Sequence, residues 1–369
     1  MIVGMKKVSP IGAVEHLSKL VSFQTVSGCS DEVDTCFDYL EDYLSGHNLH
    51  LKRITSDGFP SLFATTRPTT APTVLLQAHI DVVPAKATSF TFTEKAGKLY
   101  GRGVYDMKFA AACYLQLVDD LKANLGDYDF GIMFTSDEEI NGKNGVCYLL
   151  EKGYGAEVCI LPDGGNDWHI ETTCNAVWIT RLVSEGVSAH GSRPWEGRNA
   201  INNLVEALGE IRSLFGELEP FKNSITISKI QGGEAINQVP DQAEATIDMR
   251  FTSDHEYAAN REKIENIAKD RKLTLKTVAY VASRNVDTSQ PTIKEFLDIA
   301  AHLHGQAITK THSFGASDAC YFANHGIPTI VIRPNGGGAH SDHEWIDKAE
   351  LLKFYELIKT YVIQTTKVG

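Results

Sequence analysis

Histidine and carboxylate side chains follow several apolar segments of this sequence, and side chains of these types can bind a metal ion. The first such segment is 73–78, which leads into His79-Ile80-Asp81. An apolar run without alternation predicts a strand that is buried on both faces. Residues two apart in a strand point to the same side. Asp81 can therefore accept a hydrogen bond from one nitrogen of His79 and leave the other nitrogen for a metal. For this pair alone, a metal-free histidine hydrogen-bonded at a strand end is the alternative.

Three further predicted strands lead to residues of the same types. The strands are 130–134, 158–161 and 328–332, and the residues that follow them are Glu138, Glu139, Asp163 and, beyond a glycine-rich loop, His340. In open α/β sheets, ligands bind beyond the carboxyl ends of the strands. Carboxylates gathered there repel one another unless a cation lies among them. The sequence therefore predicts a metal centre at one edge of a sheet.

The elements that must position these residues alternate between strands and helices. Helical periodicity covers 10–22, 31–45, 107–123 and 143–152. Such alternation predicts an α/β fold with a mixed, mostly parallel sheet flanked by helices. Residues 175–285 show a different order, strand-helix-strand-strand-helix-strand, which is ferredoxin-like. We therefore expect a metal-binding catalytic domain formed by 1–174 and 286–369, and an inserted α+β domain formed by 175–285.

Composition and charge limit the class of protein. A chain of 369 residues, 43% of them hydrophobic, can bury a large core. The formal net charge of −12 argues against a nucleic-acid partner, which needs clustered lysine and arginine. Without a run of 18 apolar residues or the apolar core of a secretory signal, we expect no membrane span and no export. The 7 scattered cysteines, without a CxxC pair, indicate a reducing, cytoplasmic compartment.

The polar residues described above belong to five short motifs. They are His79-x-Asp81, GRGVYDMK at 101–108, DEE at 137–139, PDGG at 162–165 and HSDHE at 340–344. In this order they resemble the zinc amidohydrolase and exopeptidase family of acetylornithine deacetylase, succinyl-diaminopimelate desuccinylase, aminoacylase, glutamate carboxypeptidase and tripeptide aminopeptidase. Each motif alone is a weak signal, but five in order are a strong one. The resemblance covers nearly the whole chain, including the inserted domain, and implies a zinc-exopeptidase-like fold.

The resemblance implies two metal ions that share Asp106. One ion would also be held by His79 and Asp163, and the other by Glu139 and His340. One imidazole and two carboxylates suit Zn²⁺ and are acceptable to Co²⁺ or Mn²⁺. A bridging carboxylate suits a pair of ions.

Two of these assignments have alternatives in the sequence. Asp106 stands where a helix N-cap is expected, and aspartate is a good cap. His343 competes with His340, but the family's ligand histidine stands four residues before a glutamate, as His340 does before Glu344. The resemblance also implies a cis peptide bond between Asp106 and Met107.

Glu138 is the residue that we predict to be the general base. Adjacent side chains of an extended backbone diverge, so Glu139 can bind a metal while Glu138 faces the attacking water. Glu138 would take a proton from that water and pass it to the leaving nitrogen. A solvated acidic turn is the alternative for this acidic triplet alone.

The resemblance places the substrate contacts mainly in the inserted domain, which would act as a lid. His190 would stabilise the oxyanion, often across a dimer; an ordinary surface histidine is its alternative. Asn237 would hydrogen-bond the tetrahedral intermediate. Arg250 would clamp a substrate carboxylate, or form an ion pair with a neighbouring acid. Gly315 and Ser317 would belong to a loop of backbone donors. The family also implies a homodimer through the inserted domain.

The function that follows is metal-dependent hydrolysis of an amide bond in a short peptide or an N-acyl amino acid. Asp163 favours a peptidase, because family deacylases and carboxypeptidases tend to carry glutamate there. The compact length favours the deacylase side instead. A catalytically silent binding protein on the same scaffold is a further alternative, but every expected metal position is filled. A serine α/β-hydrolase would need G-x-S-x-G, which does not occur.

Overall fold

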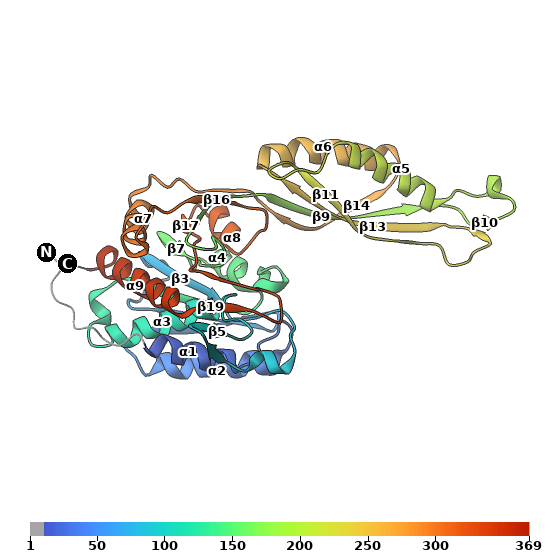
Figure 1. Cartoon of the computed structure of the whole chain (residues 1–369). Coiled ribbons are helices and arrows are strands. Elements are labelled where there is room, and N and C mark those ends of the chain that lie inside the picture. Colours follow the sequence, from blue (N-terminus) through green and yellow to red (C-terminus); the bar gives the residue numbers. More distant parts are fainter. Residues whose placement is uncertain (1–10, 369) are drawn as a thin grey trace. The chain divides into compact units, whose positions relative to one another are not determined.

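The computed structural model describes residues 11–368, which form two compact units (Figure 1). The first unit contains the chain up to Thr172, Val286–His312 and the chain from Ser317 onward. The second unit contains Thr173–Asn285 and the short segment Ser313–Ala316. The chain therefore leaves the first unit twice, for a long segment and then for a short one, and each time returns to complete the same fold.

The first unit is built on a six-stranded sheet in the order β1-β2-β6-β3-β7-β17. Strands β6, β3, β7 and β17 pair in parallel, whereas β1 and β2 add an antiparallel hairpin. Every residue of β3, β6 and β7 is buried, which explains their unbroken apolar sequences. The predicted strand 328–332 is shorter in the structure. The bounds are β1 (His50–Ser56), β2 (Phe59–Thr65), β3 (Val74–His79), β6 (Phe130–Thr135), β7 (Val158–Ile160) and β17 (Thr329–Ile330).

Helices cover both faces of this sheet. Leu76 and Ala78 of β3 belong to one hydrophobic cluster and Leu75 to another, because alternate side chains point to opposite faces. The predicted helix 143–152 is interrupted, since Lys143–Cys147 forms a π-turn before α4 begins. On the first face lie α1 (Ile11–Val21), α2 (Ser30–Ser45), α3 (Lys108–Leu121), α7 (Pro291–His304) and α9 (Lys348–Thr365); on the other lie α4 (Tyr148–Glu151) and α8 (Ala319–Asn324).

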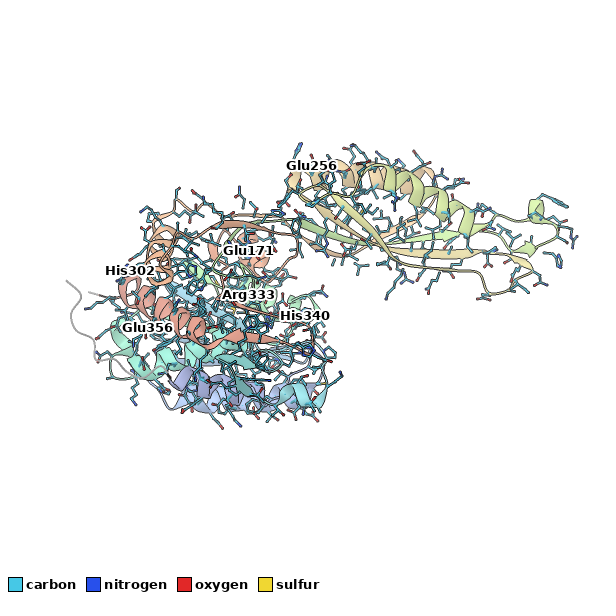
Figure 2. All side chains as sticks on the ribbon, viewed as in Figure 1. Glu171, Glu256, His302, Arg333, His340 and Glu356 are labelled. Carbon is cyan, nitrogen blue, oxygen red and sulfur yellow. The ribbon has the colours of Figure 1, made fainter. Side chains whose placement is uncertain are left out.

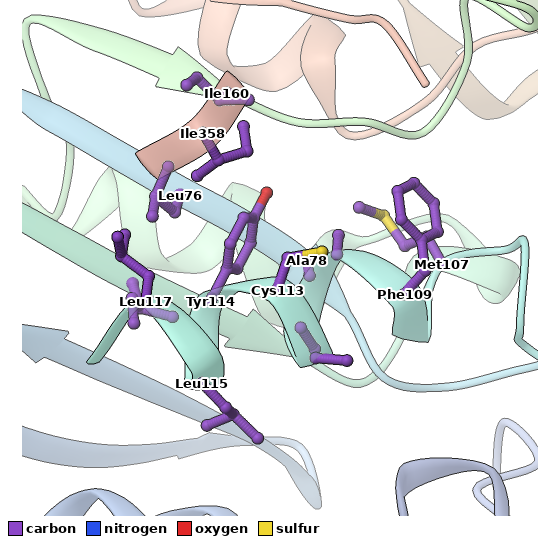
Figure 3. Close-up of a cluster of buried hydrophobic side chains, with 14 of the residues drawn as sticks. Leu76, Ala78, Met107, Phe109, Cys113, Tyr114, Leu115, Leu117, Ile160 and Ile358 are labelled. Atoms are coloured by element: carbon purple, nitrogen blue, oxygen red, sulfur yellow. The ribbon is translucent and has the colours of Figure 1, made fainter. Parts of the chain in front are cut away.

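Helix α3 lies in the middle of the larger cluster. Nearly all of its residues are buried, and Tyr114 packs beside Leu76 and Ile358 (Figure 3). The Tyr114 hydroxyl also donates a hydrogen bond of 3.2 Å to the main-chain oxygen of Gln77 on β3. Because α3 begins two residues after Asp106, its burial fixes the position of that carboxylate relative to the sheet.

A smaller sheet in the order β18-β19-β5-β4 joins two distant parts of the chain. Strand β5 ends just before the loop that carries Asp106, and β18 and β19 flank the loop that carries His340. Pairing of β19 with β5 therefore brings these two loops together. The bounds are β4 (Thr93–Lys95), β5 (Lys98–Tyr100), β18 (Gly336–Gly337) and β19 (Trp345–Asp347).

The second unit contains an antiparallel sheet in the order β11-β13-β9-β14, with two helices. Its elements follow the predicted strand-helix-strand-strand-helix-strand order, and its hydrophobic cluster is its own. The main bounds are β9 (Ala176–Glu185), α5 (Ala200–Ser213), β11 (Ser224–Gly232), β13 (Gln242–Phe251), α6 (Asp254–Asp270) and β14 (Thr274–Val281). Its short strands are β10 (Ala189–His190), β12 (Gln238–Val239) and β15 (Arg284–Asn285), while β8 (Ile170–Cys174) and β16 (Lys310–Ser313) cross from the first unit into the second. The role of this unit as a lid stays a prediction.

Two further expectations concern the environment of the chain. Among the helices of residues 11–368, none is both long and apolar enough to span a bilayer. The seven cysteines are all free thiols, and most of them are buried. The cytoplasmic location stays a prediction.

Candidate metal centre

Six residues at the carboxyl edge of the parallel strands form two groups that could each hold a metal ion. His79 ends β3, the turn with Glu138 and Glu139 follows β6, and Asp163 follows β7. Within each group the ligand atoms lie within 4.8 Å of one another. We call His79, Glu138 and Asp163 the first ligand group, and Asp106, Glu139 and His340 the second ligand group.

Asp106 joins the two groups. Its Oδ1 lies 3.5 Å from His79 Nε2, and its Oδ2 lies 3.3 Å from His340 Nε2. The N-cap of α3 is Met107, without a side-chain cap, so Asp106 does not have the capping role that the sequence left open. The Asp106-Met107 peptide bond is cis, as the resemblance implied. Asp106 thus offers one oxygen to each histidine, as a bridging ligand would.

The composition of the first ligand group differs from the predicted set in one respect. Its third member is Glu138, whereas the sequence assigned Asp106 to this ion and left Glu138 free as the general base. The Glu138 carboxylate therefore lies close enough to His79 and Asp163 to act on a molecule bound between them.

Asp81 forms hydrogen bonds with His79 and with the turn of Glu138 and Glu139, and the sequence predicted only the bond with His79. His79 Nδ1 donates to the main-chain oxygen of Asp81 at 3.0 Å, while the Asp81 carboxylate lies 3.6 Å away. That carboxylate instead accepts the main-chain N–H groups of Glu138 and Glu139 at 3.2 and 3.1 Å, and the Ser27 hydroxyl at 2.7 Å. The predicted carboxylate–imidazole bond is therefore wrong. The tautomer is still fixed, because a carbonyl oxygen can only accept.

His340 and His343 are clearly separated in the structure. His340 Nε2 lies 3.2 Å from Glu139 Oε2, whereas His343 is exposed and belongs to neither group. His340 has φ of 63°, a left-handed conformation that costs a residue with a side chain about 1–3 kcal/mol. The two group histidines also differ in exposure, since the side chain of His79 is 1% exposed and that of His340 is 54% exposed.

The carboxylates of the site carry more negative charge than the protein side chains around them balance. Burial, and then the neighbouring Asp106, raise the pKa of Asp163 to about 7. Burial and the nearby Asp163 raise the pKa of Glu138 well above its usual range. Asp106 is the exception: burial opposes its ionisation, but the neighbouring imidazoles of His340 and His79 hold its pKa well below the usual value. A cation bound among these carboxylates would stabilise their ionised forms.

The donor atoms fit divalent metal ions. His79 Nε2 is buried and has no hydrogen-bond partner, and with Nδ1 protonated its lone pair is available to a metal. Each group offers one imidazole nitrogen and two carboxylates. This mixed nitrogen and oxygen set suits Zn²⁺, Co²⁺ or Mn²⁺ better than Ca²⁺ or Mg²⁺.

Arg333 is a residue of the site that the sequence analysis missed (Figure 2). Its Nη1 lies 3.8 Å from Asp106 Oδ1 and 4.0 Å from Asp163 Oδ1. The guanidinium lies over the Tyr105 ring, 4.1 Å from the centroid, and its Nε donates to Asn166 at 2.6 Å. Arg333 follows β17 by three residues, so the strand-end rule that located the other residues applies to it as well.

The predicted substrate contacts lie mainly in the second unit. His190 on β10 accepts at Nδ1 from the Ser192 N–H at 3.2 Å, so in the neutral ring Nε2 carries the proton. Gly191 N–H donates to the main-chain oxygen of Asn237 at 2.7 Å, which places these two loops together. Arg250 forms a two-pronged ion pair with Asp248, at 2.6 and 2.8 Å, the alternative that the sequence left open.

The loop of Gly315 and Ser317 crosses between the units. Gly315 belongs to the second unit, and Ser317 belongs to the first, just before α8. The roles of Gly315, Ser317, His190, Asn237 and Arg250 toward substrate stay predictions.

Comparison with known proteins identifies the family. Residues 75–364 match the sequence model of peptidase family M20/M25/M40. The chain belongs to this family. The family resemblance and the predicted fold class are thereby confirmed, and the chain is a metallohydrolase of the M20/M25/M40 type. Members of this family depend on metal, in agreement with the two ligand groups, although the identity of the ion is a separate question.

This M20/M25/M40 chain is similar in sequence to a curated desuccinylase and similar in fold to solved peptidase structures. It is 26% identical over 382 residues to succinyl-diaminopimelate desuccinylase of Rickettsia akari (strain Hartford), covering 95% of this chain and 99% of that protein. Its fold is similar to that of aminopeptidase PepT from Bacillus cereus ATCC 10987, with a TM-score of 0.77, 19% identity and coverage of 97% and 99%. Human carnosine dipeptidase 1 has a TM-score of 0.70, 14% identity and coverage of 96% of both chains.

Proposed function

We propose that this chain hydrolyses the amide bond of a short peptide or an N-acyl amino acid with the help of two divalent metal ions. The observation that carries this proposal is the pair of ligand groups joined by Asp106 at one edge of the sheet. We propose zinc as the metal, with cobalt or manganese as alternatives, because of the mixed nitrogen and carboxylate ligands.

The predicted division of labour follows from the side chains of the site. His79, Asp106, Glu139, Asp163 and His340 would hold the two ions. When bound, such a metal pair lowers the pKa of water and polarises the scissile carbonyl. Glu138, at the first ligand group and next to Glu139 in the chain, would accept the proton of the attacking water and deliver it to the leaving nitrogen. Asp81 would hold Glu138 and Glu139 in place through their main-chain N–H groups.

Residues of the second unit, together with Ser317 of the first, would bind the substrate. His190, with a proton on Nε2, would donate to the developing oxyanion, and Asn237 would support the tetrahedral intermediate. Arg250 would exchange Asp248 for a substrate carboxylate, and Gly315 and Ser317 would supply loop contacts. We further propose that this unit forms the interface of a homodimer, which sedimentation of the full chain would test.

A peptide is the substrate class that we place first. Asp163 stands where the family's deacylases tend to carry glutamate, and solved structures of similar fold include an aminopeptidase and a dipeptidase. An N-acyl amino acid is the second candidate, because the desuccinylase relatives align over 95% of this chain.

A paired assay of the metal-loaded chain tests the function and separates the two classes. Dipeptides with free N-termini are compared with N-acetyl and N-succinyl amino acids, with and without a chelator. We expect turnover of one class, abolished by the chelator and restored by zinc, cobalt or manganese. Chelator-resistant turnover, or none of either class, would contradict the proposal.

A further inference from the structure

Glu344 is a buried carboxylate that lies outside both ligand groups but close to the second one. It is 3% exposed and stands four residues after His340, at the start of the segment that forms β19. No step of the proposed reaction uses it. Its position therefore needs a different explanation.

Four donors, all from one loop, saturate this carboxylate. Oε1 accepts the main-chain N–H groups of Tyr105 at 2.8 Å and Asp106 at 3.0 Å. Oε2 accepts the Gly103 N–H at 2.9 Å and Arg102 Nη1 at 2.8 Å. A carboxylate offers about four acceptor sites, so the 101–106 loop takes up the full capacity of Glu344.

These bonds join the two chain segments that supply the second ligand group. Asp106 is itself one of the residues whose N–H is bound, and His340 lies on the segment that carries Glu344. The left-handed backbone of His340 is unfavourable for a residue with a side chain, and it persists only if its surroundings hold it. The first ligand group depends on these segments only through Asp106, whose Oδ1 lies 3.5 Å from His79 Nε2, whereas the second group takes both Asp106 and His340 from them.

We propose that Glu344 is a positioning residue for the second ligand group, which sets the distance between Asp106 and His340 and thereby the affinity of that group for its metal ion. This inference rests on the proposed metal centre. It predicts an unequal effect, in which loss of Glu344 weakens the second ligand group, which loses the placement of two ligands, more than the first, which shares only Asp106. A residue that only stabilised the fold would affect both groups alike.

The test uses glutamine at position 344. In Glu344→Gln the amide oxygen can still accept from two donors, but the new NH₂ group faces the other two donors, so half of the bonds are lost. Alanine removes all four. Asp342→Asn is the matched control, because Asp342 lies two residues away, is exposed and forms a surface ion pair with Lys86. Thermal unfolding of each variant reports separately on the fold.

The primary measurement is metal binding of the full chain, by titration of the metal-free protein with Zn²⁺ and by the absorption of bound Co²⁺. The wild type should bind two ions. In Glu344→Gln the affinity for one of the two ions should fall about 10–100-fold, while Asp342→Asn should match the wild type. Excess metal should restore kcat of Glu344→Gln with little change in KM.

Double variants assign the weakened ion to a group. His340→Ala removes a ligand of the second group, so His340→Ala with Glu344→Gln should bind metal as His340→Ala does alone. Asp163→Ala removes a ligand of the first group, so its combination with Glu344→Gln should weaken both sites. Two ions bound by Glu344→Gln with wild-type affinities would overturn the role of Glu344 alone. A wild-type chain that binds no metal would instead overturn the proposed function.

Discussion

Replacement of Glu138 is expected to separate catalysis from metal binding. Glu138→Gln keeps the size of the side chain but cannot accept the proton of the attacking water. We expect kcat to fall about 10²–10⁴-fold, the usual contribution of a general base, with metal content and unfolding temperature near wild type. Glu151→Gln on α4 is a control, because Glu151 belongs to neither ligand group. A Glu138→Gln enzyme with full activity would remove the assignment.

The two histidines near the C-terminus form a natural matched pair. His340 lies 3.2 Å from Glu139 and 3.3 Å from Asp106, whereas His343 is exposed. We expect His340→Ala to lose about one metal ion per chain and most of its activity, and His343→Ala to keep both. Elemental analysis of the two purified variants measures this, and a normal metal content in His340→Ala would be the contrary result.

The residue types of the centre could be predicted from the sequence, but several of their contacts could not. His79, Glu139 and Asp163 stand at the ends of apolar runs, and the topology of parallel strands brings such ends together. Whether His79 bonds to the carboxylate or to the main-chain oxygen of Asp81 depends on a few tenths of an ångström. Periodicity carries no information at that scale.

The turn after β6 is the element on which both glutamates depend. Gly142 follows them with φ of 61°, and a Cβ at this position would lie 1.9 Å from the buried Asp318 carboxylate. Gly153 also has a positive φ, of 84°, but nothing lies within 4 Å of its Cβ position. Replacement by alanine would therefore strain the backbone at both positions. It would cause a steric clash only at Gly142.

Alanine substitutions at these two glycines should have unequal effects. We expect Gly153→Ala to lower stability by about 1–2 kcal/mol, the cost of a left-handed backbone, without loss of kcat. Gly142→Ala should cost about 1–3 kcal/mol more from the clash and should also lower kcat, since Glu138 and Glu139 must move. Urea unfolding and steady-state kinetics measure both effects, and equal results for the two variants would contradict this account.

Helices and strands could be predicted from the sequence where their hydrophobic pattern is clear. The apolar runs of β3 and β6 and the long apolar helix α3 lie where the sequence placed them. Strand β17 is shorter than the predicted strand 328–332, and the predicted helix 143–152 begins with a π-turn at Lys143–Cys147 before α4. The Arg333 and Glu344 contacts bridge segments more than 160 residues apart, as between Arg333 and Asn166, so only the folded chain brings these partners together.

Across the whole chain, all the predicted metal ligands belong to the first unit, and the two units have separate hydrophobic clusters. We expect calorimetry to show two unfolding transitions, of which a chelator lowers only one. Ions present at about 100 times their Kd stabilise by about 2.7 kcal/mol each, which corresponds to about 5–10 °C for a unit of this size.

Variant chains identify the transition that responds to metal. Asp163→Ala should reduce the shift of the unfolding temperature that the chelator causes. Arg250→Ala in the second unit should leave this shift unchanged. If the chelator lowered both transitions equally, the metal would have to contact both units.

The unequal exposure of His79 and His340, 1% against 54%, has a consequence for how the centre acquires its ions. An ion beside the buried imidazole must shed most of its hydration shell and leaves slowly, whereas an ion beside the exposed imidazole can exchange with ions in the surrounding solution. Sequential loading with two different elements should therefore yield a heterobimetallic enzyme of defined arrangement. In a cell, the more accessible position would follow the current supply of transition metals, while the enclosed one would retain the ion acquired during folding.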